Sequence, residues 1–266
     1  MSVSDDFGQG DMGSRSKERP EGMAARKAPA EVQLVRPIHL PTWSRLNVAT
    51  KQWALGGNGG DFFEVIQQRD GRVTTVMADV CGNGPSASAP VANLRWILRQ
   101  QIAAGDSPGM VLATLNDWLV RQKTDDRFVT AVCVRIDVVG GRAEIASAGH
   151  LGPFVKRAGG GAEDLPCSVG LALGILPEQT YRETTVDLAP EDTVVLVTDG
   201  ITDRLATADD PLGQQGLIQR LARARHGTES VCSALLGPDI RAQDATVVVM
   251  QLPRRHRRAT PLANYG

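Results

Sequence analysis

Four aspartates stand at the ends of apolar, strand-like runs, where their carboxylates could come together. Asp61 lies in GGNGGDFFEV, Asp79 follows VTTVMA, Asp199 follows VVLVT and Asp244 precedes ATVVVM. Strand ends are rigid, and the small residues beside them let backbone and solvent approach the carboxylates. Carboxylate oxygens are hard ligands that suit Mg²⁺ or Mn²⁺ better than zinc. The pattern predicts a site for a hard divalent cation that is built from several strand ends.

Other phosphate-handling motifs are missing from the sequence. The glycine-rich stretch before Asp61 could cradle a phosphate, but no GK[ST] follows it and no helical pattern begins there, which excludes a P-loop or a Rossmann motif. None of the four cysteines has an arginine six positions later, as a cysteine-dependent phosphatase loop would require. A single aspartate at a strand end is usually a turn former. The prediction therefore depends on all four aspartates together.

The elements that must position these aspartates are mostly strands joined as hairpins. Alternating or continuous apolar runs predict strands over residues 46–55, 62–68, 72–80, 128–138, 143–148, 153–157, 181–188, 193–198 and 245–252. Helical spacing predicts helices over residues 86–104, 107–122 and 212–225. Hairpin linkage favours antiparallel sheets, because parallel pairs need long crossovers. We therefore expect a layered α+β domain.

Composition limits the class of protein and its surroundings. The chain has 266 residues and a formal net charge of −1, which argues against a nucleic-acid partner. The cysteines form no CxxC pair and predict a reducing compartment. The first residues have no apolar signal core, and no run approaches the roughly 20 apolar residues of a membrane span. We expect a cytoplasmic protein without a membrane partner.

Three segments are expected along the chain. Residues 1–35 are rich in Gly, Ser, Pro and mixed charges, and they predict a disordered arm. Residues 36–252 carry the strand and helix patterns and form one domain. Residues 253–266 make a basic tail that reads PRRHRRATPLANYG, and we interpret it as a solvated end of the chain.

The ordered motifs of this domain carry a family resemblance. The blocks GGDFFEV, ADVCGNGPSAS, ASAGHLGPFV, GLALGIL, VTDGITD and DATVVVMQL follow one another between residues 45 and 252. This order resembles the SpoIIE-type branch of the metal-dependent protein phosphatases, within the protein phosphatase 2C-like superfamily. The resemblance implies a four-layer α-β-β-α sandwich with two antiparallel sheets. It also implies two Mn²⁺ or Mg²⁺ ions at one edge of the sandwich.

The resemblance assigns metal-binding roles to particular residues. Asp79 matches the aspartate that bridges both ions, and the carbonyl of Val80 matches a ligand of one of them. Asp199 matches a ligand of the other ion, so that Asp79 and Asp199 are the expected catalytic pair. Asp61 matches an acidic residue that binds directly or through water.

The last block departs from the family pattern. The family usually has Asp-Asp-x-Thr there and uses the first Asp as a ligand, whereas this chain has Gln243-Asp244-Ala245-Thr246. Either Asp244 supplies the carboxylate after a small shift, or one ion is bound more weakly. The second alternative would allow a non-catalytic binding module with a phosphatase-like fold.

The expected activity is hydrolysis of phosphoserine or phosphothreonine on a partner protein by metal-activated water. By analogy with the family, the substrate would be an anti-sigma-factor antagonist or a stressosome-type protein in a bacterial partner-switching or stress-response pathway. His150, in SAGHLGPF, could be a general acid, but we expect it at a turn outside the metal cluster in a structural role.

Overall fold

The fold was analysed in a computed structural model of the chain. The structure describes residues 31–38, 46–54, 60–81, 91–122, 128–210, 213–236 and 244–254. Two sheets make up the centre of the molecule, and each contributes one half of the candidate site.

Sheet A has six strands in the order β1-β2-β12-β11-β7-β8. Their bounds are β1 Glu31–Ile38, β2 Asn47–Ala54, β12 Ala245–Gln251, β11 Thr193–Val197, β7 Phe154–Lys156 and β8 Ala162–Asp164. Every neighbouring pair in sheet A is antiparallel. The two central strands, β11 and β12, place Asp199 and Asp244 at the same edge, because one strand ends where the other begins.

Sheet B has the strand order β10-β6-β5-β4-β3, and the short strand β9 is attached to β6. The bounds are β10 Thr184–Asp187, β6 Arg142–Ala148, β5 Val129–Asp137, β4 Val73–Val80, β3 Asp61–Gln67 and β9 Val169–Gly170. All pairs are antiparallel except β6 with β9. The hairpin of β3 and β4 pairs Asp61 directly with Asp79.

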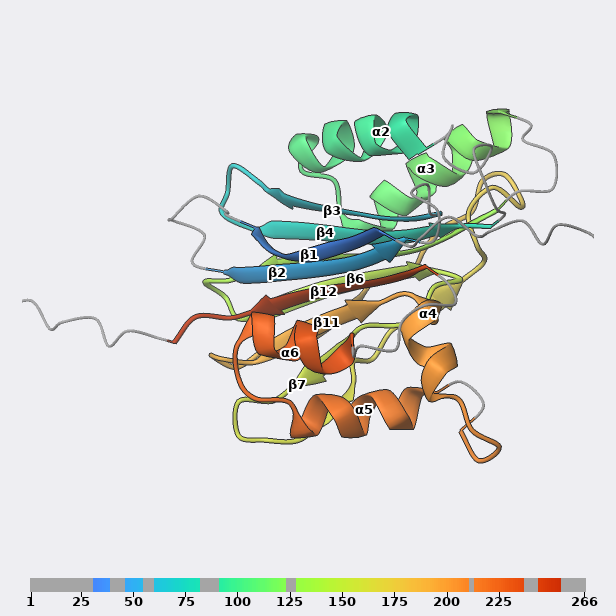
Figure 1. Ribbon diagram of the computed structural model, residues 1–266. Coiled ribbons are helices and arrows are strands. Elements are labelled where there is room, and N and C mark those ends of the chain that lie inside the picture. The colour runs from blue at the N-terminus through green and yellow to red at the C-terminus, as the bar shows by residue number, and fades with distance from the viewer. Residues whose placement is uncertain are drawn as a thin grey trace, which may run out of the picture.

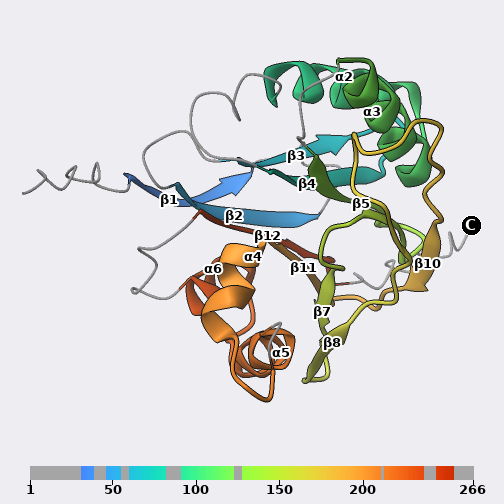
Figure 2. The ribbon, with the colours of Figure 1, turned by 90° about the vertical axis from the view of Figure 1, so that its right-hand side faces the viewer.

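Helices cover the outer face of each sheet, which gives four layers (Figure 1). Helices α2 (Val91–Ala104) and α3 (Pro108–Gln122) lie over sheet B. Helices α5 (Gln214–Arg223) and α6 (Thr228–Leu235) lie over sheet A. The short helix α4 (Asp199–Thr202) and the 3₁₀ turn η2 (Asp203–Leu205) follow β11. The turned view separates the two sheets between these helical layers (Figure 2).

Alternating side chains of the strands build three apolar layers. On β5, Ala131 and Cys133 face helices α2 and α3, whereas Val132 and Val134 face sheet A. On β12, Val248 faces sheet B, while its neighbours in the strand face α5 and α6. Because both faces of the central strands β11 and β12 are buried, these two strands are apolar along most of their length instead of alternating with polar residues.

The structure confirms the predicted α+β, four-layer class, with β9 as a small parallel exception. The elements that the sequence analysis did not predict are short or have weak patterns: β1, β8, β9, α4 and α6. Residues 86–90, at the start of the expected 86–104 helix, lie outside the described residues.

The expected domain limits stay predictions, although strands lie beside both of them, and β12 ends at Gln251, just before the limit at residue 252. Strand β1 begins at Glu31, so the boundary predicted at residue 35 falls inside a strand. The rest of the predicted arm, and the tail after Arg254, lie outside the described residues. Among the described helices, none has the length and apolar character needed to cross a membrane.

Candidate metal centre

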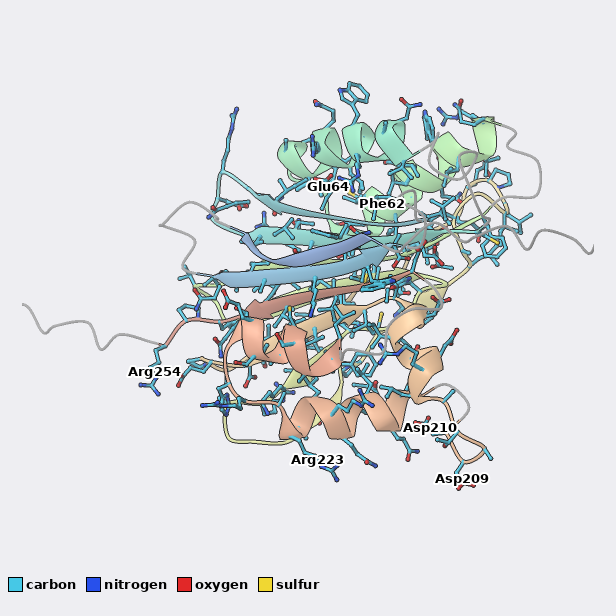
Figure 3. The ribbon with its side chains drawn as sticks, in the orientation of Figure 1. Phe62, Glu64, Asp209, Asp210, Arg223 and Arg254 are labelled. Carbon is cyan, nitrogen blue, oxygen red and sulfur yellow. The ribbon has the colours of Figure 1, made fainter. Side chains whose placement is uncertain are left out.

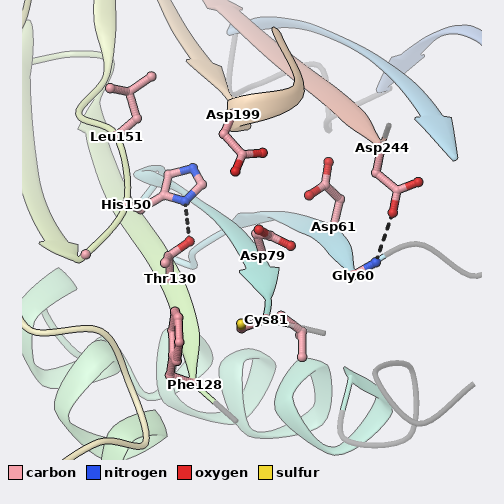
Figure 4. Close-up of a pocket in the computed structure, with 12 residues that line it drawn as sticks. Gly60, Asp61, Asp79, Cys81, Phe128, Thr130, His150, Leu151, Asp199 and Asp244 are labelled. Atoms are coloured by element: carbon pink, nitrogen blue, oxygen red, sulfur yellow. Dashed lines mark hydrogen bonds between the residues drawn. The ribbon is translucent and has the colours of Figure 1, made fainter. Parts of the chain in front are cut away.

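All four aspartates named from the sequence line one pocket of about 410 Å³ at the edge where both sheets end. The pocket is also lined by Gly60, Val80, Cys81, Phe128, Thr130, Gly149, His150 and Leu151. Figure 4 shows the carboxylates of Asp61, Asp79 and Asp199 turned toward a common space, while the carboxylate of Asp244 points to the Gly60 N–H. The structure thus brings together residues that are up to 183 positions apart in the chain, from Asp61 to Asp244.

The β3–β4 hairpin supplies one half of the site. Asp61 and Asp79 are partners across the two strands, and the Val80 backbone N–H donates to the carbonyl of Gly60 at 3.2 Å. A Cβ on Gly60 would lie 2.7 Å from the Val80 carbonyl oxygen and 3.0 Å from Asp79 Oδ1. Glycine is therefore required here so that this carbonyl and carboxylate keep open space beside them.

Buried hydroxyls fix the carboxylate of Asp61. The hydroxyls of Thr198 and Thr246 donate to Asp61 Oδ2 at 2.7 and 2.8 Å. The side-chain amide of Gln52 donates to the Asp61 carbonyl at 3.0 Å. All three donors belong to the sheet A side of the site, so the Asp61 end of β3 is attached to the opposite sheet.

Asp199 and Asp244 supply the other half. Asp199 begins helix α4 directly after β11, and Asp244 directly precedes β12. Helix α4 packs so closely on the chain before β12 that a Cβ on Gly200 would lie 1.8 Å from the Asp244 carbonyl oxygen. The Gly60 N–H donates to Asp244 Oδ2 at 3.2 Å, which also joins this half to β3.

The electrostatics of the pocket favour a cation. Burial, followed by the charges of Asp199 and Asp244, raises the pKa of Asp79 to about 6. Burial raises the pKa of Asp61 to about 7, against the lowering effect of the Thr198 hydroxyl. The pKa of Asp199 is also raised, first by burial and then by the charge of Asp203. Carboxylates crowded in this way repel one another unless a cation lies between them.

The donor set fits Mg²⁺ or Mn²⁺, because it consists of carboxylates and a backbone carbonyl. Among the described residues, however, no group of three or more His, Cys, Asp or Glu side chains stands close enough to hold an ion as it is. Ion binding would therefore require the carboxylates to turn toward the ion.

The expected position of His150 was wrong, because the residue lines the same pocket as the aspartates. Its Nδ1 lies 2.9 Å from the Thr130 hydroxyl, and its Nε2 is buried without a hydrogen bond of normal geometry among the described residues. Burial lowers the pKa of His150 to about 4, only partly offset by the nearby Val197 backbone. The ring is therefore neutral near pH 7, which disfavours it as a general acid.

Sequence reasoning missed Thr198, Thr246 and Thr130 as residues of this edge. Thr198 and Thr246 each stand within two positions of a predicted aspartate, which was the available indication. Gln243, the residue at the usual ligand position of the family, lies outside the described residues. The ligand roles of Asp61, Asp79, Val80, Asp199 and Asp244 stay predictions.

The chain belongs to the Stage II sporulation protein E (SpoIIE) family, whose model matches residues 69–253, more than half of the chain. This family match agrees with the resemblance seen in the ordered motifs. Asp79, Asp199 and Asp244 lie inside the matched range, and Asp61 lies just before it.

Curated relatives share the domain but are longer proteins. Phosphoserine phosphatase RsbU of Bacillus subtilis is 27% identical over 146 residues, which cover 54% of this chain and 43% of RsbU. Protein IcfG of Synechocystis sp. is 24% identical over 212 residues, which cover 70% of this chain and 33% of IcfG. The chain thus spans less than half the length of these relatives.

Solved structures share the fold. The RsbU and RsbW domains of Rv1364c from Mycobacterium tuberculosis match with a TM-score of 0.65 and 25% identity, covering 74% of this chain and 56% of that one. The PP2C phosphatase domain of SpoIIE from Bacillus subtilis matches with a TM-score of 0.67 and 19% identity, covering 79% and 64%. RsbX in complex with magnesium matches with a TM-score of 0.64 and 18% identity, covering 82% and 100%.

Proposed function

We propose that this protein is a metal-dependent phosphatase that removes phosphate from serine or threonine of a partner protein. The observation that carries the proposal is the convergence of Asp61, Asp79, Asp199 and Asp244 on one pocket in a member of the SpoIIE family. The names of the relatives RsbU and RsbP, both phosphoserine phosphatases, support the same reaction class.

Five groups would hold two Mn²⁺ or Mg²⁺ ions: the carboxylates of Asp61, Asp79, Asp199 and Asp244 and the carbonyl of Val80. When bound, such ions supply positive charge that offsets the charge of a phosphomonoester and lowers the pKa of a water molecule. Asp79 faces carboxylates from both sheets and is the proposed bridge between the ions. RsbX, a structural neighbour, was solved in complex with magnesium, which supports a divalent cation for this fold.

An exposed apolar segment joined to the pocket wall supports a protein substrate over a small phosphoester. Leu171, Ile175 and Leu176 are exposed, although they are large and apolar. Their segment adjoins the pocket, because Leu173 exchanges two backbone hydrogen bonds with Val129, the residue after the pocket-lining Phe128. Exposed apolar side chains gathered at one place are typical of surfaces that contact another protein.

We propose a phosphorylated anti-sigma-factor antagonist or a stressosome-type protein as the substrate, in a partner-switching or stress-response pathway. The name RsbU belongs to such systems. One curated relative and one domain of Rv1364c carry this name, and the chain is similar to both proteins. The proposed site of action is the cytoplasm.

The alternative is a phosphatase-like module that binds a partner without catalysis, and Gln243 is the residue that favours it. The presence of all four pocket carboxylates favours activity, because such a cluster is costly to maintain without a cation.

The test is the release of phosphate from a serine-phosphorylated anti-sigma-factor antagonist, with Mn²⁺ titrated and EDTA as the control. We expect Mn²⁺-dependent turnover that falls to the EDTA level in the Asp79→Asn variant. Free phosphoserine should be hydrolysed much more slowly than the phosphoprotein. No turnover at millimolar Mn²⁺, together with recovery in Gln243→Asp, would support the binding module instead.

A further inference from the structure

We propose that Thr198 and Thr246 are positioning residues that set the distance between the two halves of the metal centre through Asp61. This inference rests on the proposed function, because it concerns how the same site holds its ions. It assigns a task to two hydroxyls outside the expected set of ligands.

The two halves of the metal centre come from different sheets. Asp61 and Asp79 belong to sheet B, whereas Asp199 and Asp244 adjoin strands of sheet A. The two sheets pack through apolar side chains in a layer that includes Val132 and Val248. Apolar contacts have no directional preference, so they do not by themselves fix how far apart two groups of carboxylates stand at the edge.

Two hydrogen bonds cross from sheet A to Asp61 in sheet B. Thr198 follows β11 and Thr246 lies in β12, and both hydroxyls donate to the same oxygen, Asp61 Oδ2, from the opposite sheet. The Thr246 N–H donates to the Thr198 hydroxyl oxygen at 2.9 Å, and the Thr198 N–H donates to the Thr246 carbonyl at 3.1 Å. The hydroxyl of Thr198 therefore accepts one hydrogen bond and has its single hydrogen left for Asp61.

The other carboxylate oxygen of Asp61, Oδ1, stays available to an ion. Neither threonine bonds to Asp61 Oδ1, so this oxygen is left to the pocket, where Asp61 faces Asp79 in Figure 4. Both threonine side chains are fully buried, so water does not compete with them for Oδ2. Each threonine is also close in sequence to a carboxylate of the other half, Asp199 or Asp244. We call Asp61, Thr198 and Thr246 the Asp61 clamp. These three residues join the two halves of the site by short and rigid connections.

Holding Asp61 in place affects how tightly the site would bind an ion. No ready-made group of three His, Cys, Asp or Glu side chains stands among the described residues. Carboxylates must then turn toward an ion before they can hold it, and the clamp lowers the cost of this adjustment by keeping the Asp61 side chain in place beforehand. Residues that orient metal ligands typically contribute 10- to 100-fold to metal affinity.

The experiment measures Mn²⁺ binding to the metal-free protein by isothermal titration calorimetry, which does not depend on activity. Thr198→Val and Thr246→Val keep the side-chain shape and remove the donor; Thr246→Val is the cleaner of the two, because Thr198→Val also removes the acceptor of the Thr246 N–H. We expect each to weaken Mn²⁺ binding by about 10- to 100-fold. Thr198→Ser and Thr246→Ser keep the hydroxyl and should stay within about threefold of the wild type, since the donor that orients the carboxylate remains.

A matched control is available in Thr75→Val. Thr75 is also fully buried and also crosses between the sheets, but its hydroxyl contacts Met250 Sδ at 3.0 Å, away from Asp61. Its Mn²⁺ affinity should be unchanged. A loss in Thr75→Val as large as in the two clamp variants would overturn the proposal, because it would show a general effect of inter-sheet hydroxyls.

A double-variant comparison tests whether the threonines act through Asp61. In an Asp61→Asn background, Thr246→Val should weaken Mn²⁺ binding no further, whereas an additional full loss would contradict the clamp. In steady-state assays, the clamp variants should need more Mn²⁺ for half-maximal activity while recovering most of kcat at saturation. If a Val variant does not fold, Thr→Cys replaces it, because cysteine keeps a similar volume with a much weaker donor.

The outcomes separate this inference from the proposed function. Val variants that fold and bind Mn²⁺ as the wild type does would overturn the clamp alone. A wild type that binds Mn²⁺ but releases no phosphate would overturn the proposed function alone. A wild type that binds no Mn²⁺ would overturn both.

Discussion

At the scale of single residues, the site depends on side chains that are absent as much as on those that are present. Gly60 leaves room beside the Val80 carbonyl, and Gly200 lets helix α4 reach the Asp244 backbone. His150 also lines the pocket. Its imidazole ring is neutral, and its Nδ1 is hydrogen-bonded to the Thr130 hydroxyl. These residues shape the space in which the carboxylates meet.

Gly60→Ala is expected to weaken Mn²⁺ binding by about tenfold or more, because the new methyl group would press on the Val80 carbonyl and the Asp79 carboxylate. Calorimetric titration with Mn²⁺ measures the effect. Gly159→Ala is the control, since a Cβ there meets no atom within 4 Å and Gly159 does not line the pocket. Equal Mn²⁺ affinities for the wild type and Gly60→Ala would contradict the placement of Val80 beside an ion.

His150 should make folding stability depend on pH. Its pKa falls from 6.5 to about 4 on folding, chiefly because the ring is buried. Between these values the unfolded chain binds a proton that the folded protein does not, so stability is complete above pH 6.5 and falls as the pH falls toward 4. Relative to His150→Gln, the wild type should lose up to about 3 kcal/mol across this window. Urea unfolding at several pH values in EDTA measures this difference, and parallel pH profiles for the two proteins would contradict it.

At the scale of elements, helix α2 is fastened to the strand that carries Asp61. Glu64 on β3 is buried and accepts hydrogen bonds from Arg95 at 2.9 Å and from Arg99 at 3.1 Å, beneath α2 in Figure 3. Arg95 also lies over the ring of Phe62, 5.6 Å from its centre. The helical layer thus holds β3 from the side opposite the Asp61 clamp.

Glu64→Gln should lower the free energy of unfolding by about 1–3 kcal/mol, because two arginines lose a buried carboxylate partner. Urea unfolding measures the loss. Arg254→Ala removes the exposed pair of Arg254 with Glu191 and should change stability by less than about 0.5 kcal/mol. Equal losses in the two variants would mean that the α2 attachment is no stronger than a surface ion pair.

The elements also explain which parts of the site the sequence could predict. The Asp61–Asp79 pair follows from a hairpin, because the turn at residues 69–71 sets the register of β3 and β4. The clamp could not be predicted in this way, because Thr198 and Thr246 are 137 and 185 positions from Asp61. Sheet pairing from a single sequence does not specify which strand edges of two stacked sheets meet. His150 was misplaced for a different reason, since its turn follows β6 and is joined within sheet B to β5, through the bridge between Gly149 and Ala131.

At the scale of the whole molecule, two sheets meet at an edge where like charges accumulate, and this arrangement exchanges stability for function. The layered α+β class was predictable because hairpins and apolar strands recur along most of the chain, whereas the four-layer α-β-β-α arrangement was implied by the family resemblance. The short elements β8, β9, α4 and α6 left little pattern in the sequence, and they lie around the long strands of the two sheets.

Asp79→Asn should raise the melting temperature of the metal-free protein by a few degrees, because it removes one of the mutually repelling charges. The wild type should be stabilised progressively by added Mn²⁺, since a ligand of the folded state shifts unfolding by mass action, whereas Asp79→Asn should respond weakly. Thermal melts with EDTA and with increasing Mn²⁺ provide the comparison. A metal-free variant less stable than the wild type would argue against strong repulsion in the pocket.

The most direct test of the account is anomalous diffraction from crystals of the protein grown with Mn²⁺. The account predicts two manganese peaks in the pocket, with the Asp79 carboxylate between them, Asp199 and Asp244 on the sheet A side, and the Val80 carbonyl beside one ion. Peaks elsewhere on the surface, or none in the pocket at millimolar Mn²⁺, would contradict the proposal that these aspartates form a catalytic metal centre.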